Sequence, residues 1–151
     1  MSIEATLAEK GITLPAAPAP AANYVPFVQT GNLVFVSGQI SQDEGGLIKG
    51  RLGDGMSVED GAAAARRCGL SLIAQLKAAV GDLDRVRRVV KLTGFVNSTP
   101  DFTDQPKVIN GCSDLMVELF GDAGRHARAA VSAAALPLGV AVEIEAIFEV
   151  A

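Results

Sequence analysis

The sequence has 151 residues, of which 49% are hydrophobic and 20% charged, and its formal net charge is −4. This length and composition are typical of one globular domain, so we expect residues 1–151 to form a single domain with an aliphatic core. Because proteins bind a phosphate backbone mainly through Lys and Arg, the acidic balance argues against nucleic acid as a partner.

Residues 1–22 predict a short helix followed by a connector. Residues 2–10 can form a helix, with Ser2 as its N-cap and Gly11 at its end. The stretch from Leu14 to Ala22 is composed almost entirely of proline and alanine, which favours an extended connector over regular secondary structure.

Two strands and a loop are predicted next. Tyr24–Gln29 and Leu33–Ile40 are rich in β-branched and aromatic residues, and the pair Gly31-Asn32 between them is typical of a hairpin turn. Residues 43–56 hold several glycines, which predicts a loop with room for short strand pairing inside it. These glycines do not stand in the order of a phosphate-binding loop, so we assign them no phosphate site.

The rest of the chain alternates helices and strands. Hydrophobic periodicity predicts helices over 57–80 and 104–120 and strands over 85–97, 126–134 and 140–150. The resulting order, β-β-loop-α-β-α-β-β, is satisfied by an α+β fold with a sheet covered by two helices on one face. Because no further helix of any size is left for the other face, we expect that face to be covered by oligomerisation.

The remaining composition bears on cofactors and location. Cys68 and Cys112 have neither CxxC nor Cys/His spacing, so we expect two buried thiols, no disulfide and no metal site. The basic residues of 85–91 are spaced as on a solvated strand face. No segment resembles a signal peptide or is long and apolar enough to span a membrane, and we expect a cytoplasmic protein without a membrane partner.

Several short motifs, taken together, resemble the RidA/YjgF family. Val36–Ile40 reads VSGQI, and Ala127–Val131 (ARAAV), Leu136-Pro137 and Val142–Ile147 (VEIEAI) resemble the C-terminal signature of that family. The order and spacing of these motifs are similar to those of the family over residues 24–148. The resemblance is strongest to its longer members, which carry Gly-Arg-His-Ala-Arg before the fifth strand.

The resemblance implies a chorismate-mutase-like fold and a homotrimer with clefts between subunits. It also implies hydrolysis of an enamine or 2-imino acid to a 2-keto acid and ammonia, without a cofactor. Arg128 falls where the family binds the substrate carboxylate, a role that suits the two parallel donors of a guanidinium. Glu143 falls where a carboxylate orients the attacking water and moves a proton. Tyr24, Gly38 and Asn110 fall at substrate-binding positions.

Each of the other candidate residues also has a plainer interpretation. Tyr24 can be a packing residue, Gly38 a bend in a strand, and Asn110 an ordinary residue of a helix surface. His126, the only histidine, lies two residues before Arg128 and is either structural or part of the rim of the cleft.

Whether Arg128 and Glu143 can meet depends on how the last two strands pair. In a tight hairpin around residues 136–139, Glu143 would face Ser132, which lies about 13 Å along the strand from Arg128. The two side chains can therefore meet only through a different strand order or across an interface between subunits.

Three other functions stay open on the sequence. The first is a non-catalytic binder of small carboxylates, which needs Arg128 but no positioned water. The second is a pathway-specific enzyme for a bulkier aromatic or amino-sugar intermediate, for which the small side chains around Ala130 leave room. The third is a ribonuclease or translation inhibitor, which the acidic pI of about 4.9 and the single histidine disfavour.

Overall fold

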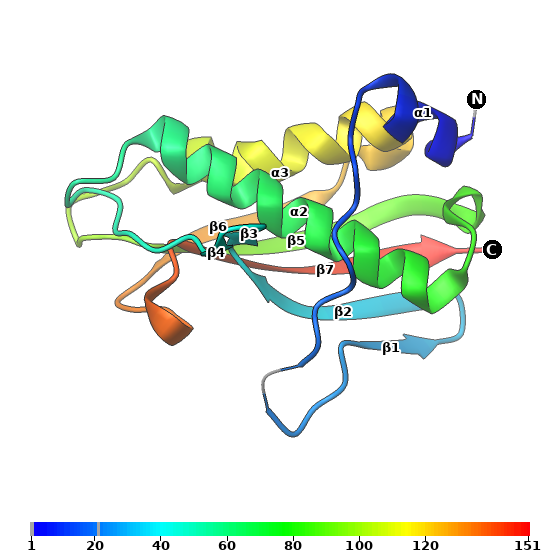
Figure 1. Cartoon of the computed structure of the whole chain (residues 1–151), viewed down its shortest axis with the longest axis horizontal. Coiled ribbons are helices and arrows are strands. Elements are labelled where there is room, and N and C mark those ends of the chain that lie inside the picture. Colours follow the sequence, from blue (N-terminus) through cyan, green and yellow to red (C-terminus); the bar gives the residue numbers. More distant parts are fainter. Residues whose placement is uncertain (1, 21) are drawn as a thin grey trace.

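A five-stranded sheet with helices on one face organises the chain, as the computed structural model shows for residues 2–20 and 22–151 (Figure 1). The strands and helices in chain order are α1 (Ile3–Glu9), β1 (Phe27–Thr30), β2 (Leu33–Ile40), β3 (Gln42–Asp43), β4 (Gly46–Leu47), α2 (Val58–Val80), β5 (Val86–Asn97), α3 (Gln105–Phe120), β6 (Ala127–Ala133) and β7 (Val142–Val150). Short 3₁₀ turns, η1 (Leu83–Arg85), η2 (Gly121–Gly124) and η3 (Pro137–Gly139), join some of them.

The strand order of the sheet is β1-β2-β7-β5-β6. All neighbouring pairs are antiparallel except β5 and β6, which run parallel, so the predicted α+β fold is confirmed, and its sheet is mixed and mostly antiparallel. Because β5 lies between β6 and β7, the last two strands do not form a hairpin. Arg128 on β6 lies beside Leu92 of β5, whereas Glu143 on β7 lies beside Phe95.

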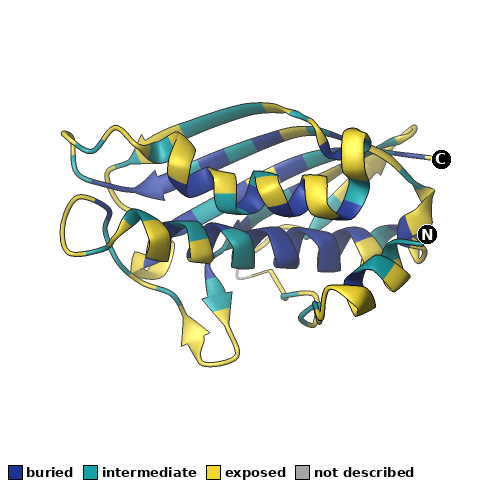
Figure 2. Ribbon diagram, turned by 90° about the horizontal axis from the view of Figure 1, so that it is seen from above, coloured by how far each residue is buried: buried dark blue, intermediate teal, exposed yellow. Residues whose placement is uncertain are grey.

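Helices α2 and α3 lie side by side over one face of the sheet (Figure 2). Ser57 caps α2, because its side chain accepts a hydrogen bond from the Asp60 N–H, whereas Asp104 precedes α3 without a side-chain capping hydrogen bond. The helices approach closely at Gly111, where an added Cβ would overlap the backbone carbonyl of Ala62. Between helices and sheet lies the core, in which Ile144 and many other aliphatic side chains are fully buried.

The opposite face of the sheet carries exposed apolar side chains. Val28, Phe35 and Val131 are exposed to 52%, 40% and 44%. Phe35 stands between the buried Val34 and Val36, so it must point away from the helices. Over the described residues no helix covers this face, which agrees with the expectation of an uncovered apolar surface.

The predicted element bounds hold within one or two residues, apart from the start of the first strand. Tyr24–Gln29 was expected to be a strand, but β1 begins at Phe27 and Tyr24 lies in a bend. Pro26 explains the difference, because it has no N–H with which to continue the ladder. Short pairing of β3 with β4 occurs inside the predicted loop. None of the helices in the described parts of the chain is long and apolar enough to cross a membrane.

Candidate functional site

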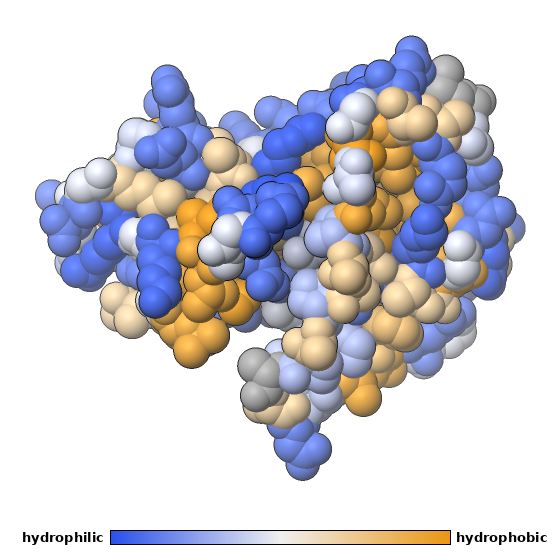
Figure 3. All heavy atoms as spheres, in the orientation of Figure 1, coloured by the Kyte–Doolittle hydropathy of each residue, from blue (hydrophilic) through white to orange (hydrophobic). Residues whose placement is uncertain are grey.

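A cavity of about 560 Å³ lies where the last residue of β2, Ile40, pairs with Glu143 at the start of β7. Figure 3 shows the corresponding hollow between the N-terminal connector and the η3 turn, with hydrophobic side chains on its rim. Its apolar walls come from the connector, β2, β4 and η3, and include Pro18, Pro20, Tyr24, Ile40, Leu47 and Leu138. The connector is fixed against α2 because the Gln75 side-chain amide donates to the Pro18 carbonyl at 2.6 Å.

Glu143 is the acidic side chain that lines this cavity. It stands between Val142 and Ile144, which are fully buried on the helix side, so its carboxylate points to the open face of the sheet. Burial, and secondarily the negative charge of Glu145, raise the pKa of the Glu143 carboxyl above its ordinary value. A half-buried carboxyl with a raised pKa holds a proton more tightly than a free carboxyl, which suits a group that first accepts and then donates a proton.

Gly38 leaves the space that the Glu143 carboxylate occupies. A Cβ on Gly38 would overlap that carboxylate. Gly38 lies in β2 where the pairing with β7 shifts its register between Val36 and Gln39, a place where glycine commonly marks a bulge. Its interpretation as a bend and its interpretation as a site residue are therefore both consistent with the geometry.

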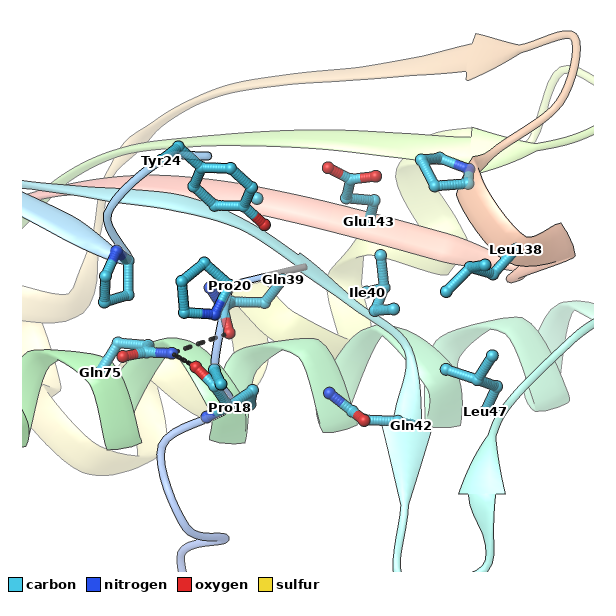
Figure 4. A pocket seen from close by; sticks show the side chains of 14 residues that line it. Pro18, Pro20, Tyr24, Gln39, Ile40, Gln42, Leu47, Gln75, Leu138 and Glu143 are labelled. Atoms are coloured by element: carbon cyan, nitrogen blue, oxygen red, sulfur yellow. Dashed lines mark hydrogen bonds between the residues drawn. The ribbon is translucent and has the colours of Figure 1, made fainter. Parts of the chain in front are cut away.

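Tyr24 lines the same cavity from the rim. Figure 4 shows Tyr24 and Glu143 on the side of the sheet away from α2, whereas Gln39, Gln75 and Pro18 lie on the helix side. The Tyr24 side chain is 48% exposed, so it can contact a ligand that enters the cavity. Of the predicted site residues, Tyr24, Gly38 and Glu143 thus gather in one place.

Arg128 and Asn110 form a second cluster, on the helix side of the sheet. Arg128 Nη1 donates to Asn110 Oδ1 at 2.7 Å and to Ser113 Oγ at 3.2 Å, and both acceptors belong to α3. Ser113 Oγ lies 2.9 Å from His126 Nε2, and His126 Nδ1 lies 2.6 Å from the Gly124 carbonyl oxygen. A guanidinium held in this way is suited to binding an anion.

The two clusters do not meet within one chain. Arg128 lies beside Leu92, whose side chain is fully buried under the helices, and Glu143 points to the opposite face. Strand β5 also separates them. The observed strand order therefore does not bring Arg128 and Glu143 together. The other possibility considered from the sequence was that they meet across an interface between subunits, and this one is left.

Ser113 is a member of the Arg128 cluster that the sequence interpretation missed. It follows Asn110 by three residues on α3, so the two side chains share one face of the helix. That spacing was visible in the sequence, but the contact with His126 was not, because it depends on how α3 packs beside η2.

Neither cysteine is a candidate nucleophile or metal ligand. Both are fully buried and unpaired, as the sequence predicted. Burial raises the pKa of the Cys112 thiol to about 12, against the opposing positive charge of Arg128, and raises that of Cys68 as well. Within residues 2–20 and 22–151, no three His, Cys, Asp or Glu side chains gather as a metal site.

Comparison with known proteins gives a consistent result. The model of the family described as "YjgF/chorismate_mutase-like, putative endoribonuclease" matches residues 4–149. Protein TCP17 of Trypanosoma cruzi is 54% identical over 149 residues, which are 97% of this chain and 93% of TCP17.

Solved structures show the same likeness. The structure of Atu1372, a protein of unknown function from Agrobacterium tumefaciens, is 47% identical, with a TM-score of 0.90 over 99% of this chain and 94% of that one. The structure of TdcF from E. coli with bound serine is 28% identical, with a TM-score of 0.65 over 89% of this chain and 94% of TdcF.

Proposed function

The chain belongs to the YjgF/chorismate-mutase-like family, and on that premise we propose that it is an imine deaminase. It hydrolyses 2-imino acids to 2-keto acids and ammonia at clefts between the subunits of a homotrimer. The observation that carries this proposal is the division of the site: a guanidinium held by hydrogen bonds at the β6 edge, and a half-buried carboxyl with a raised pKa in a cavity on the other face.

The trimer is supported by the uncovered apolar face of the sheet. This face carries the exposed side chains of Val28, Phe35 and Val131. Their burial against a second copy of the chain lowers the free energy of the assembly, because apolar surface is removed from water. A head-to-tail arrangement that closes on itself presents the β6 edge of one subunit to the open face of the next. Each cleft then takes Arg128 from one subunit and Glu143 from its neighbour.

The reaction needs few groups. Arg128 holds the substrate carboxylate and so fixes the imine carbon in the cleft. The substrate enters as the protonated imine, and Glu143 accepts a proton from water as the water oxygen bonds to the imine carbon, which gives a neutral tetrahedral carbinolamine. Glu143 returns that proton to the nitrogen, the C–N bond breaks with release of ammonia, and the hydroxyl proton passes to Glu143 and then to solvent, which leaves the ketone.

The cavity walls favour imino acids with apolar side chains. At about 560 Å³ the cavity has space well beyond a three-carbon imino acid, given that one water takes about 30 Å³ of liquid volume. Ile40, Leu47 and Leu138 offer apolar surface for a longer side chain. The serine bound to TdcF supports a ligand with an amino acid skeleton.

A non-catalytic binder of small carboxylates is the second candidate. The hydrogen bonds that hold Arg128 in place favour it, because they form a carboxylate site without any contribution from Glu143. The word endoribonuclease in the family description does not lead us to propose RNA cleavage, because a chain with a net charge of −4 is poorly suited to binding phosphate.

The test is release of ammonia and keto acid from freshly generated 2-imino acids, measured above the spontaneous rate. Wild type is compared with Arg128→Ala, and with Asp114→Ala as a control on the exposed surface of α3. We expect acceleration by wild type and the control that is lost in Arg128→Ala. No acceleration on any imino acid, with pyruvate binding that still requires Arg128, would favour the binder instead.

A further inference from the structure

The guanidinium of Arg128 stands at the end of a chain of hydrogen bonds that includes the only histidine of the protein. The chain runs from the Gly124 carbonyl through His126 and Ser113 to Arg128. Its three links measure 2.6, 2.9 and 3.2 Å between heavy atoms. Ser113, His126 and Arg128 are all half-buried, so water competes only partly with these bonds.

The direction of each bond follows from chemistry. A carbonyl oxygen can only accept, so the hydrogen between His126 and Gly124 belongs to Nδ1. In the neutral ring Nε2 then carries no hydrogen and accepts from the Ser113 hydroxyl. The Ser113 oxygen keeps its lone pairs for the N–H of Arg128. Burial lowers the pKa of His126, with a smaller contribution from the positive charge of Arg128, against the hydrogen bond to the Gly124 carbonyl, which raises it; the net shift is downward and favours the neutral ring.

The consequence is a fixed orientation of the guanidinium. Both hydrogens of Nη1 are used, one by Asn110 and one by Ser113. No described residue accepts from Nε or Nη2 of Arg128, and these two groups present parallel N–H bonds along one edge of the guanidinium. A carboxylate that approaches this edge receives two charge-assisted hydrogen bonds at once.

We propose that His126 and Ser113 are positioning residues, which hold the Nε/Nη2 edge of Arg128 in the orientation that receives a substrate carboxylate. The inference rests on the proposed function for the identity of the ligand, a 2-imino or 2-keto acid. His126 acts through Ser113 and does not itself touch the substrate.

Steady-state kinetics separate positioning from chemistry. In His126→Ala the Ser113 hydroxyl loses its acceptor and Arg128 can rotate, so we expect KM for the imino acid to rise about tenfold while kcat changes little. His126→Gln places an amide oxygen near the position of Nε2 and should restore most of the affinity. Ser113→Ala should match His126→Ala, and the double variant should add little to either single variant.

Two kinetic results would overturn the inference. The first is unchanged KM in both His126→Ala and Ser113→Ala. The second is a large fall in kcat at constant KM in Ser113→Ala, which would make the serine a reacting group instead. Asp114→Ala, on the adjacent exposed position of α3, is the control for general effects on the helix.

Nitrogen NMR of the single histidine gives a readout that is independent of turnover. We expect the neutral Nδ1–H tautomer at pH 7, and a shift of the Nε2 signal on addition of pyruvate that is absent in Arg128→Ala. An Nε2–H tautomer or a charged ring would contradict the relay. A pyruvate-dependent shift without any deaminase activity would support the positioning role of His126 and reject the proposed function. Turnover without the shift would support the proposed function and reject the positioning role.

Discussion

The Arg128 cluster and the Glu143 cavity differ in how many hydrogen bonds hold their ionisable side chain. Arg128 is held by Asn110 and Ser113 before any ligand arrives. Glu143 stands in a mostly apolar cavity, where no described residue donates a hydrogen bond to its carboxylate and its pKa is raised. A group that must hold a fixed charge benefits from a rigid network, whereas a group that must exchange protons benefits from a neutral form that is easily reached.

Glu143→Gln should have the largest effect on activity. Because the amide cannot take a proton from water, we expect turnover of 2-imino acids to fall by about 10² to 10⁴-fold, while pyruvate binding persists. Turnover within about threefold of wild type would remove Glu143 from the reaction.

The same variant should be more stable than wild type in the absence of ligand. The folded chain binds the Glu143 proton more tightly than the unfolded chain, so the free energy of unfolding falls as the pH rises from 4.5 through the raised pKa. Glutamine removes this penalty, and thermal unfolding at pH 7.5 should show a higher Tm. A lower Tm would mean that the carboxylate has a favourable partner that a single protomer does not provide.

Arg128→Lys should have the next largest effect on activity, a loss of about 10²-fold in kcat/KM. Lysine keeps the positive charge but lacks the planar pair of N–H donors that receives a carboxylate, and it cannot satisfy Asn110 and Ser113 while it binds the ligand. The loss should be mainly in KM. Circular dichroism and sedimentation should match wild type, and full activity of this variant would contradict bidentate binding.

Gly38→Ala should have a smaller effect, of about tenfold on kcat. The added methyl would overlap the Glu143 carboxylate, which can move because it is the end of a flexible side chain. The fold should therefore survive while the carboxylate is displaced from the reacting water. A loss of folding instead of activity would show that Gly38 serves only the backbone bend.

Leu138→Asn should produce the smallest change, a several-fold loss of preference for bulky apolar substrates. Leu138 has a φ of 61°, and asparagine tolerates that conformation, so the η3 turn should keep its shape. Removal of the apolar wall should lower kcat/KM for the imino acid derived from leucine relative to that derived from alanine. An unchanged ratio would place the substrate side chain elsewhere.

Much of the fold could be predicted from the sequence because its signals are local. Strict alternation of apolar residues along 140–150 indicated β7, and Ser57 before the helical pattern and Gly81 after it indicated the ends of α2. Strand order was not predictable in the same way, since the parallel pairing of β5 with β6 depends on contacts between distant segments.

The individual site residues were therefore easier to predict than their arrangement. The family resemblance selected Arg128, Asn110 and Glu143, and the structure adds that Arg128 and Asn110 are in contact. The family resemblance alone could not show that Arg128 and Glu143 occupy opposite faces of one sheet, because the face on which a side chain lies is set by the register of its strand with the neighbouring strands. Ser113 was missed because its partner His126 lies outside α3, between η2 and β6.

Complementation between inactive subunits tests most directly whether the site lies between chains. Arg128→Ala and Glu143→Gln subunits are each inactive alone, and are then mixed in equal amounts, unfolded and refolded together. Random mixing makes three-quarters of the trimers mixed, and each mixed trimer holds one intact cleft of three, so we predict recovery of about a quarter of wild-type activity. Refolded mixed trimers that remain inactive, while refolded wild type regains its turnover, would contradict a cleft shared by neighbouring subunits.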